Sequence, residues 1–206
     1  MSKENFSLKK VSLTKSSPSV SLKKKGAIGI IKVNLNWNEG EKPGLIGKLF
    51  GGKKSIDLDL AAFVRLKDGS THVIQALGDC FGNLNKPPYV QLLDDDRSGS
   101  SVDGEWLHVN GDKWNLVDEV LVYTFIYEGT ANWGATDAVV TLHIPNESPI
   151  ETCLTDGNNS KRLCAIARIV NDNDGIKVER INEFFHDQIK MDDAFNWGFK
   201  WTSGRK

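Results

Sequence analysis

"SIDLDLAAFVRLKDGSTHVIQAL" spans residues 55–77 and combines two signals of β-structure. In its first half apolar and polar residues alternate, which places Leu58 and Leu60 on one face and Asp57 and Asp59 on the other. This period of two predicts a β-strand, and the Asp-Gly pair in the middle predicts the turn of a β-hairpin. We therefore predict a hairpin whose first strand carries two carboxylates on the face opposite its leucines.

The same kinds of pattern recur along the chain. Further strands are predicted over 27–37, 105–112, 119–129, 137–146, 148–155 and 162–181. The stretch 119–129 is almost continuously apolar, which is typical of a strand buried on both faces. A short helix is predicted within 182–197. Many short strands separated by turns predict a mainly β fold, a two-sheet β-sandwich with few short helices, rather than alternating βαβ units.

Two segments stand apart in composition from this single predicted domain of residues 1–206. Residues 1–25 contain seven lysines and many serines, and we expect an edge strand there whose lysines oppose edge-to-edge pairing. Residues 42–54 are rich in lysine and glycine and read as an insertion between strands. Leucine, isoleucine and phenylalanine side chains lie between these lysines, so the insertion is a candidate for peripheral contact with an anionic membrane or for a partner's groove. The alternative is a loop that folds back on the sandwich.

The charge and the cysteine content of the chain argue against several classes of function. The formal net charge is −1, so no overall field favours nucleic acid, and no nucleic-acid partner is expected. The three cysteines, Cys80, Cys153 and Cys164, are widely spaced and form no metal-binding pair motif. The charged N-terminus does not resemble a secretion signal, and no apolar run approaches a membrane span. We expect a protein with reduced thiols in the cytoplasm.

An acidic stretch, "LLDDDRSGSSVDGE" at 92–105, is the main candidate for chemistry. It reads either as a solvated turn, because Asp, Ser and Gly favour turns, or as a cation site. Counted from Asp94, its spacing approaches the calcium loop of an EF-hand and ends on Glu105. Val102, however, stands where that loop needs an oxygen ligand, so this local match is imperfect.

Motifs for catalysis are weak by comparison. No local signature pairs a cysteine with a histidine as nucleophile and base. The six tryptophans are typical of a core, with Trp133 as a candidate exception because it lies in the loop-like "EGTANWGATD".

Several long strings in the chain resemble the TerD-type tellurium-resistance and stress-response proteins. They are "VNLNWN" (33–38), "LFGGKKSIDLDLAAF" (49–63), "VIQALGDCFG" (73–82), "PPYVQLLDDDRSG" (87–99), "GEWLHVN" (104–110), "FIYEGTANWGATDAVVTLHIP" (125–145) and "WGFKWTSGRK" (197–206). The "LFGG" insertion and the terminal motif look most like the TerA-like branch. The resemblance implies a cytoplasmic, calcium-binding β-sandwich without established enzymatic activity, acting as a scaffold or signalling module in resistance to tellurite and other stresses.

The resemblance also implies a set of metal ligands. The family's D-L-D motif falls on residues 57–59, its Asp-rich loop on 94–99, and its following acidic cluster on 103–105. The candidate calcium ligands are therefore Asp57, Asp59, Asp94, Asp95, Asp96, Asp103 and Glu105. The chain departs from the family where relatives have further acidic residues before the final Glu, because Ser100, Ser101, Val102 and Gly104 stand there, and where Asn38 replaces an Asp after the first-strand tryptophan.

Taken together, the residues and the resemblance predict that the two acidic segments converge around Ca²⁺, which prefers six to eight oxygen ligands. The predicted function is a non-enzymatic calcium-binding module, with other tellurium-resistance proteins as candidate partners. A calcium-dependent, lectin-like ligand-binding module and a thiol-dependent enzyme are the alternatives.

Overall fold

Strand β4 (Asp57–Leu66) lies next to the edge of its sheet, where it pairs with the edge strand β5 (Thr71–Ile74) on one side and with β9 (Val117–Glu128) on the other. The β4–β5 pair is the predicted hairpin. The computed structural model describes residues 9–23, 26–37, 56–93, 104–129, 131–154, 160–173 and 175–202. The whole insertion at 42–54 and residues 94–103 of the acidic stretch therefore lie outside the described residues.

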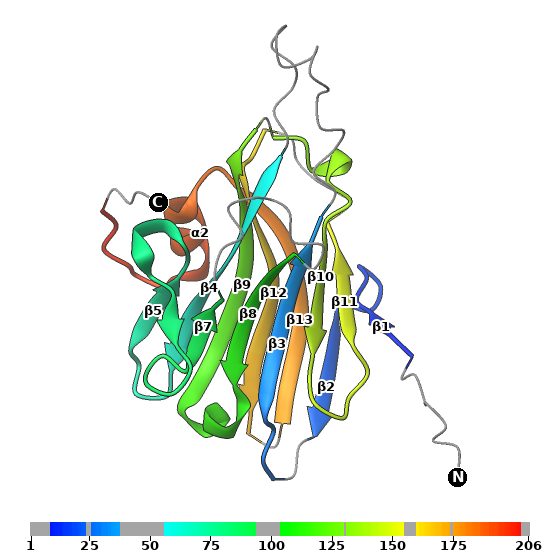
Figure 1. Cartoon of the computed structure of the whole chain (residues 1–206), viewed down its shortest axis with the longest axis vertical. Helices are drawn as coiled ribbons and strands as arrows, with labels where there is room; N and C mark the ends of the chain where they lie inside the picture. Colours follow the sequence, from blue (N-terminus) through cyan, green and yellow to red (C-terminus); the bar gives the residue numbers. More distant parts are fainter. Residues whose placement is uncertain are drawn as a thin grey trace, which may run out of the picture.

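The described strands form two sheets, which Figure 1 shows stacked on one another. Sheet A has the order β1-β11-β10-β3-β8-β7-β6, and sheet B has the order β2-β13-β12-β9-β4-β5. The strands of sheet A are β1 (Val11–Ser12), β3 (Ile30–Asn36), β6 (Gly82–Asn83), β7 (Val90–Leu92), β8 (Glu105–Asn110), β10 (Val139–His143) and β11 (Ile150–Cys153). In sheet B, β4, β5 and β9 are joined by β2 (Ser19–Lys23), β12 (Leu163–Asp172) and β13 (Gly175–Phe185). The predicted two-sheet sandwich is confirmed.

Helical structure in the described residues is short, as expected. Three 3₁₀ turns are present, η1 (Leu77–Asp79), η2 (Gly111–Leu116) and η3 (Trp133–Ala135), with one α-helix, α2 (Gln188–Phe195). The helix predicted within 182–197 is thus confirmed only in part, because β13 continues to Phe185 before α2 begins.

The main core lies between the sheets and is built from the inward-facing residues of the alternating strands. Val33 and Leu35 of β3 and Leu58 and Leu60 of β4 are fully buried there. Trp133 is also fully buried, and its indole N–H donates to the carbonyl of Lys161 at 2.8 Å. The suggestion that Trp133 is exposed for a ligand is therefore wrong, since η3 turns its ring into the core.

A second apolar layer covers the outer face of sheet B. Phe63 of β4 is fully buried there, with ring centroids 5.5 Å from Trp197, 4.7 Å from Phe199 and 5.8 Å from Trp201. Figure 1 shows this C-terminal segment and α2 together at one side of the molecule. The face of β4 that carries Asp57 and Asp59 is therefore covered in its middle by the C-terminal aromatic residues, and Arg65, near the end of the strand, lies over the ring of Trp197.

The N-terminal segment contributes an edge strand to each sheet. β1 pairs in parallel with β11 in sheet A, and β2 pairs antiparallel with β13 in sheet B. The expectation of a lysine-bearing edge strand is confirmed. Lys10, just before β1, pairs with Glu151 of β11 at 2.5 Å. Residues 13–18 cross from one sheet to the other, so one short segment joins the two sheets along the same side of the sandwich.

Asp192 holds the C-terminal segment against α2. Its side chain is buried and accepts hydrogen bonds from the backbone N–H groups of Gly198 at 2.7 Å and Phe199 at 3.0 Å. It also accepts one from the indole N–H of Trp201 at 2.7 Å. A single carboxylate therefore organises the aromatic layer over Phe63.

We expect Asp192→Ala to lower the free energy of unfolding by about 2–4 kcal/mol, because hydrogen bonds to a buried charged acceptor are lost and their donors are left unpaired. Urea unfolding followed by tryptophan fluorescence measures the change. Asp193→Ala is the matched control, since Asp193 is 65% exposed and its ion pair with Lys190 spans 3.8 Å. Equal effects of the two substitutions would contradict the role assigned to Asp192.

Candidate metal centre

Three predicted ligands that the structure describes lie at one end of the sandwich, where β4 and β8 begin. Glu105, the first residue of β8, is paired in register with Leu35 of β3. Just beyond Leu35, the indole N–H of Trp37 donates to the carbonyl of Ile56 at 3.1 Å. The ends of β3, β4 and β8 are thereby held together, although β4 belongs to the other sheet.

Glu105 reaches across from sheet A to sheet B. Its side chain is largely buried, and Oε2 accepts a hydrogen bond from the backbone N–H of Leu60 at 2.5 Å. β5 pairs only with Ala62–Arg65 of β4, so the edge of β4 at Leu60 lies beyond β5. The Glu105 carboxylate occupies this edge.

Asp59 is the residue next to this contact and is 1% exposed. It lies opposite Phe125 of β9, on the outer face of sheet B. Burial raises the pKa of the nearby Tyr123 far above its usual range, and the charge of Asp59 adds to that rise. Asp59 and Glu105 are 46 residues apart in the chain and belong to different sheets, yet Glu105 bonds to the residue that directly follows Asp59.

Tyr123 ties this region to two other segments. Its hydroxyl donates to Gln75 Oε1 at 3.0 Å and accepts from Gln188 Nε2 at 3.0 Å. Gln188 also donates to Gln75. This network joins the segment after β5 and the start of α2 to the strand that faces Asp59. No periodicity in the sequence indicates it, because its members come from three separate segments.

Asp57 begins β4 and is partly buried. It lies opposite Glu128 of β9, and the register of the two strands shifts between Asp57 and Leu58. This irregularity changes the local pairing at the first residue of β4. Asp57 is therefore the first residue of the strand, two residues before the buried Asp59.

The other four predicted ligands, Asp94, Asp95, Asp96 and Asp103, lie outside the described residues. The two ends that flank them are described. Leu93 donates its backbone N–H to Trp106 O at 2.9 Å, and Gly104 directly precedes Glu105. The acidic stretch therefore leaves and rejoins the sandwich beside Glu105. Within the described part of the chain, no group of three or more His, Cys, Asp or Glu side chains is arranged to hold a metal ion.

No family model matches the chain. A tellurium resistance protein, TerA, from Alcaligenes sp. is 56% identical over 201 residues, which make up 97% of this chain and 59% of that protein. The chain belongs to the TerD/TerA-type tellurium-resistance family. It spans less than two thirds of the relative's length.

A solved structure shares the fold of this family member. The crystal structure of a protein of unknown function, SAV2460, superposes with a TM-score of 0.59 and covers 85% of this chain and 100% of that one, at 13% identity. At this level of identity the likeness concerns the fold alone.

The three cysteines of this TerD/TerA-type chain lie in different environments. All three are free thiols. Burial raises the pKa of Cys164 far above its usual range and also raises that of Cys153, which disfavours the reactive thiolate. Cys80 is exposed, far along the chain from both. The environment of Cys153 and Cys164 therefore gives no support to a thiol-dependent reaction.

Gly104 explains one departure from the family's acidic pattern. Its φ is +70°, and a Cβ placed on it would lie 2.1 Å from the carbonyl oxygen of Leu35. A side chain, acidic or otherwise, does not fit where β8 begins so close to β3. From the sequence alone, Gly104 looks like the loss of an acidic ligand. In the structure, the absence of a side chain lets the start of β8 approach β3 closely, which positions Glu105.

We expect Gly104→Ala to destabilise the protein more than Gly69→Ala. Gly69 has a φ of +85° with no atom within 4 Å of an added Cβ, so its substitution costs about 1–2 kcal/mol of backbone strain alone. At Gly104 the clash with Leu35 adds about 1–3 kcal/mol. Chemical unfolding of both variants gives the difference, and equal losses would show that β3 and β8 are not in such close contact.

Proposed function

We propose that the chain is a non-enzymatic, calcium-binding module of tellurium resistance that acts as a scaffold or signalling component. The observation that carries the proposal is the hydrogen bond from Leu60 to Glu105, which brings a buried carboxylate of sheet A to the backbone of the residue that follows the buried Asp59 of sheet B. The ends of the acidic stretch flank the same place.

The chemistry of these residues favours calcium over other ions. Carboxylate oxygens are hard ligands, and Ca²⁺ takes six to eight of them in a flexible arrangement, whereas Mg²⁺ demands a tighter octahedron and retains its waters. The described chain offers Asp57, Asp59 and Glu105, and the remaining carboxylates of the proposed site come from residues 94–103. Like charges that are brought together in a partly dehydrated place disfavour ionisation, and a bound cation reverses that cost.

The link to tellurium rests on similarity. The TerA relative carries the name tellurium resistance protein, and 97% of this chain aligns with it at 56% identity. Because the chain corresponds to 59% of that relative, participation in tellurite resistance is proposed for the sandwich module rather than for a whole protein of that length.

Absence of catalysis and a cytoplasmic location are parts of the same proposal. The raised pKa values of Cys153 and Cys164 support the first, because thiol chemistry requires the thiolate. The free state of all three cysteines agrees with a reducing compartment. Among the described residues, no helix is long and apolar enough to cross a membrane.

Calcium is expected to raise the melting temperature of protein that has first been treated with a chelator. At a hundredfold excess over the dissociation constant, binding to the native state adds about 2.7 kcal/mol, which corresponds to about 5–10 °C. Magnesium should produce a smaller rise.

Asp59→Asn and Glu105→Gln should leave the calcium-free melting temperature equal or higher, since one like charge is removed and Gln retains an acceptor for Leu60. Both substitutions should reduce the rise in melting temperature that calcium produces.

Asp68→Asn is the matched control for these variants. Asp68 is an exposed turn residue whose Oδ1 accepts from Ser70 N at 2.9 Å and Ser70 Oγ at 2.6 Å, and Asn preserves that acceptor. Its calcium response should equal that of the parent. If Asp59→Asn and Glu105→Gln instead lower stability without calcium and keep the full gain, both residues are structural and the calcium proposal fails at this site.

The insertion at 42–54 is proposed as a peripheral contact for an anionic membrane, on the basis of its lysines and interspersed apolar residues. The full chain should float with vesicles containing phosphatidylserine, and a variant lacking 44–52 should remain in the soluble fraction. Pure phosphatidylcholine vesicles serve as the control, and salt should weaken the binding. Equal flotation of the two proteins would remove the insertion from this role and leave contact with other tellurium-resistance proteins as the remaining proposal.

A further inference from the structure

A cavity of about 340 Å³ lies at the opposite end of the sandwich from the acidic residues. Glu105 begins β8, and Gly111, which lines the cavity, follows the last residue of the same strand. Five residue steps of β-strand separate Glu105 from Asn110, which is about 17 Å. The cavity is therefore distinct from the proposed calcium site.

Three segments enclose the cavity, and glycines bring them together. They are residues 26–28 before β3, η2 after β8, and the hairpin between β12 and β13. Gly111 donates its N–H to Gly29 O at 2.8 Å, and a Cβ on Gly111 would lie 2.3 Å from that oxygen. A Cβ on Gly175 would lie 1.9 Å from Leu22 O. Any larger residue at either position would push the walls apart.

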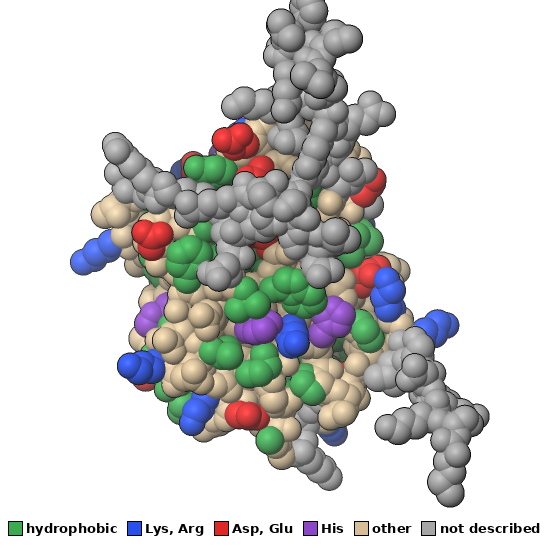
Figure 2. Space-filling view, in the orientation of Figure 1, with side chains coloured by type: hydrophobic (Ala, Val, Ile, Leu, Met, Phe, Trp, Pro, Cys, Tyr) green, Lys and Arg blue, Asp and Glu red, His purple; other side chains and the backbone are tan. Residues whose placement is uncertain are grey.

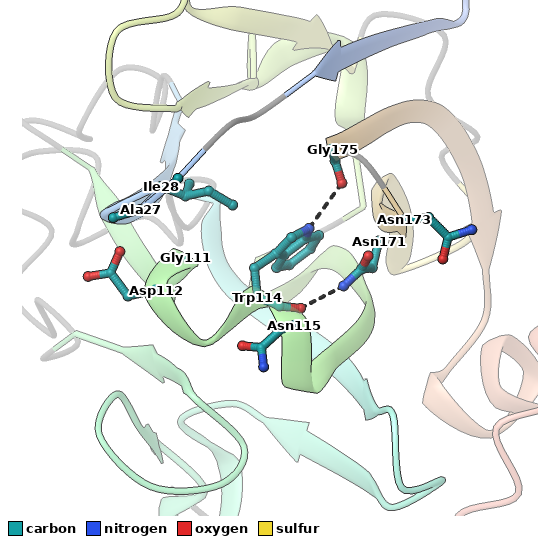
Figure 3. A pocket seen from close by; sticks show the side chains of 10 residues that line it. Ala27, Ile28, Gly111, Asp112, Trp114, Asn115, Asn171, Asn173 and Gly175 are labelled. Atoms are coloured by element: carbon teal, nitrogen blue, oxygen red, sulfur yellow. Dashed lines mark hydrogen bonds between the residues drawn. The ribbon is translucent and has the colours of Figure 1, made fainter.

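Trp114 forms the centre of the site, as Figure 3 shows. Its indole N–H donates to Gly175 O at 3.2 Å, and Asn171 Nδ2 donates to Trp114 O at 2.6 Å and to Val117 O at 2.8 Å. The ring and the Asn171 carboxamide are therefore fixed in place. Because both N–H groups of Asn171 are used, its Oδ1 is left as an acceptor beside the ring.

Further polar groups surround this centre. Asp112 Oδ1 accepts from Gly29 N at 2.9 Å, which leaves Oδ2 as a second acceptor. Asn115 and Asn173 lie around Trp114 in Figure 3, and their carboxamides make no hydrogen bond within the described part of the chain. Carboxamides both donate and accept, so the cavity offers both kinds of partner. Ile28 adds an apolar wall.

We propose that this cavity binds a small, neutral, polyhydroxylated ligand, a mono- or disaccharide. Sugar hydroxyls donate and accept at once, which matches carboxamides and a carboxylate oxygen. Trp114 is only 5% exposed, so its ring forms part of the cavity wall with Ile28 and offers the C–H groups of a pyranose a small apolar contact. Asp112 is the one charged side chain among the described lining residues, so an anion would meet its repulsion and find no compensating cation among those residues. The volume falls at the lower end of the roughly 300–1,000 Å³ range of small-molecule sites, which limits the ligand to one or two rings.

The test uses ¹⁵N-labelled full-length protein, with the indole N–H of Trp114 as the reporter in nuclear magnetic resonance titrations. The probes are glucose, mannose, galactose, N-acetylglucosamine and maltose, with inorganic phosphate and ethanolamine as an anionic and a cationic comparator. At least one sugar should shift the Trp114 signal saturably, with half-saturation on the order of millimolar for so small a ligand. A chelator should leave the titration unchanged, because the calcium site lies at the other end.

Two substitutions of one exposed residue localise the binding. Asn115→Ala should weaken it several-fold, and Asn115→Trp, which places bulk at the cavity, should abolish it. Asn85→Ala, on an exposed turn outside the cavity, is the matched control and should bind as the parent does. The proposal is overturned if no sugar shifts the signal, if only phosphate or ethanolamine does so, or if both Asn115 variants titrate like the parent.

Discussion

Strand β4 must be buried on both faces, and the rest of the structure depends on this constraint. One face packs into the space between the sheets through Leu58 and Leu60. The other carries Phe63, which a two-sheet sandwich would leave exposed. The chain meets the constraint by extending past its last strand, so that α2 and the tryptophans of the C-terminal segment cover that face. Exposing an aromatic surface of this kind would favour association between molecules.

The position of the acidic residues follows from the same strand. β5 is shorter than β4, so the first residues of β4 lie beyond it, and Glu105 bonds to the backbone there. Gly104 allows β8 to begin close enough to β3 for this reach. Asp59 is then adjacent to Glu105 because both are tied to one short segment of backbone. A carboxylate pair of this kind requires the sandwich to be assembled first, whereas an EF-hand loop carries its ligands within twelve consecutive residues.

Much of the architecture was predictable, since period-two alternation and turn residues are local signals. The β4–β5 hairpin, the doubly buried β9 and the lysine-bearing edge strand all follow from such patterns. Features that depend on distant contacts were not predictable in the same way. Trp133 looks like a loop residue until its indole is seen to bond to Lys161, and the cavity around Trp114 is formed by segments that are about 60 to 150 residues apart. Asp57, Asp59 and Glu105 were named from the sequence and the family resemblance, but the hydrogen bond to Leu60 was not. The ligand set as a whole stays a prediction, because its other four carboxylates lie outside the described residues.

The segment that crosses from β1 to β2 has a consequence for biosynthesis. Both of these strands, near the start of the chain, pair with strands near its end, and the Lys10–Glu151 contact spans 141 positions. On the ribosome the first strands therefore emerge long before β11 and β13 exist. Partners this remote slow folding and prolong the time for which unpaired strands can meet other chains. The serines and lysines in and beside β1 and β2 contribute little to the core. Before β11 and β13 are synthesised, however, they keep the unpaired edges of these two strands hydrated and charged.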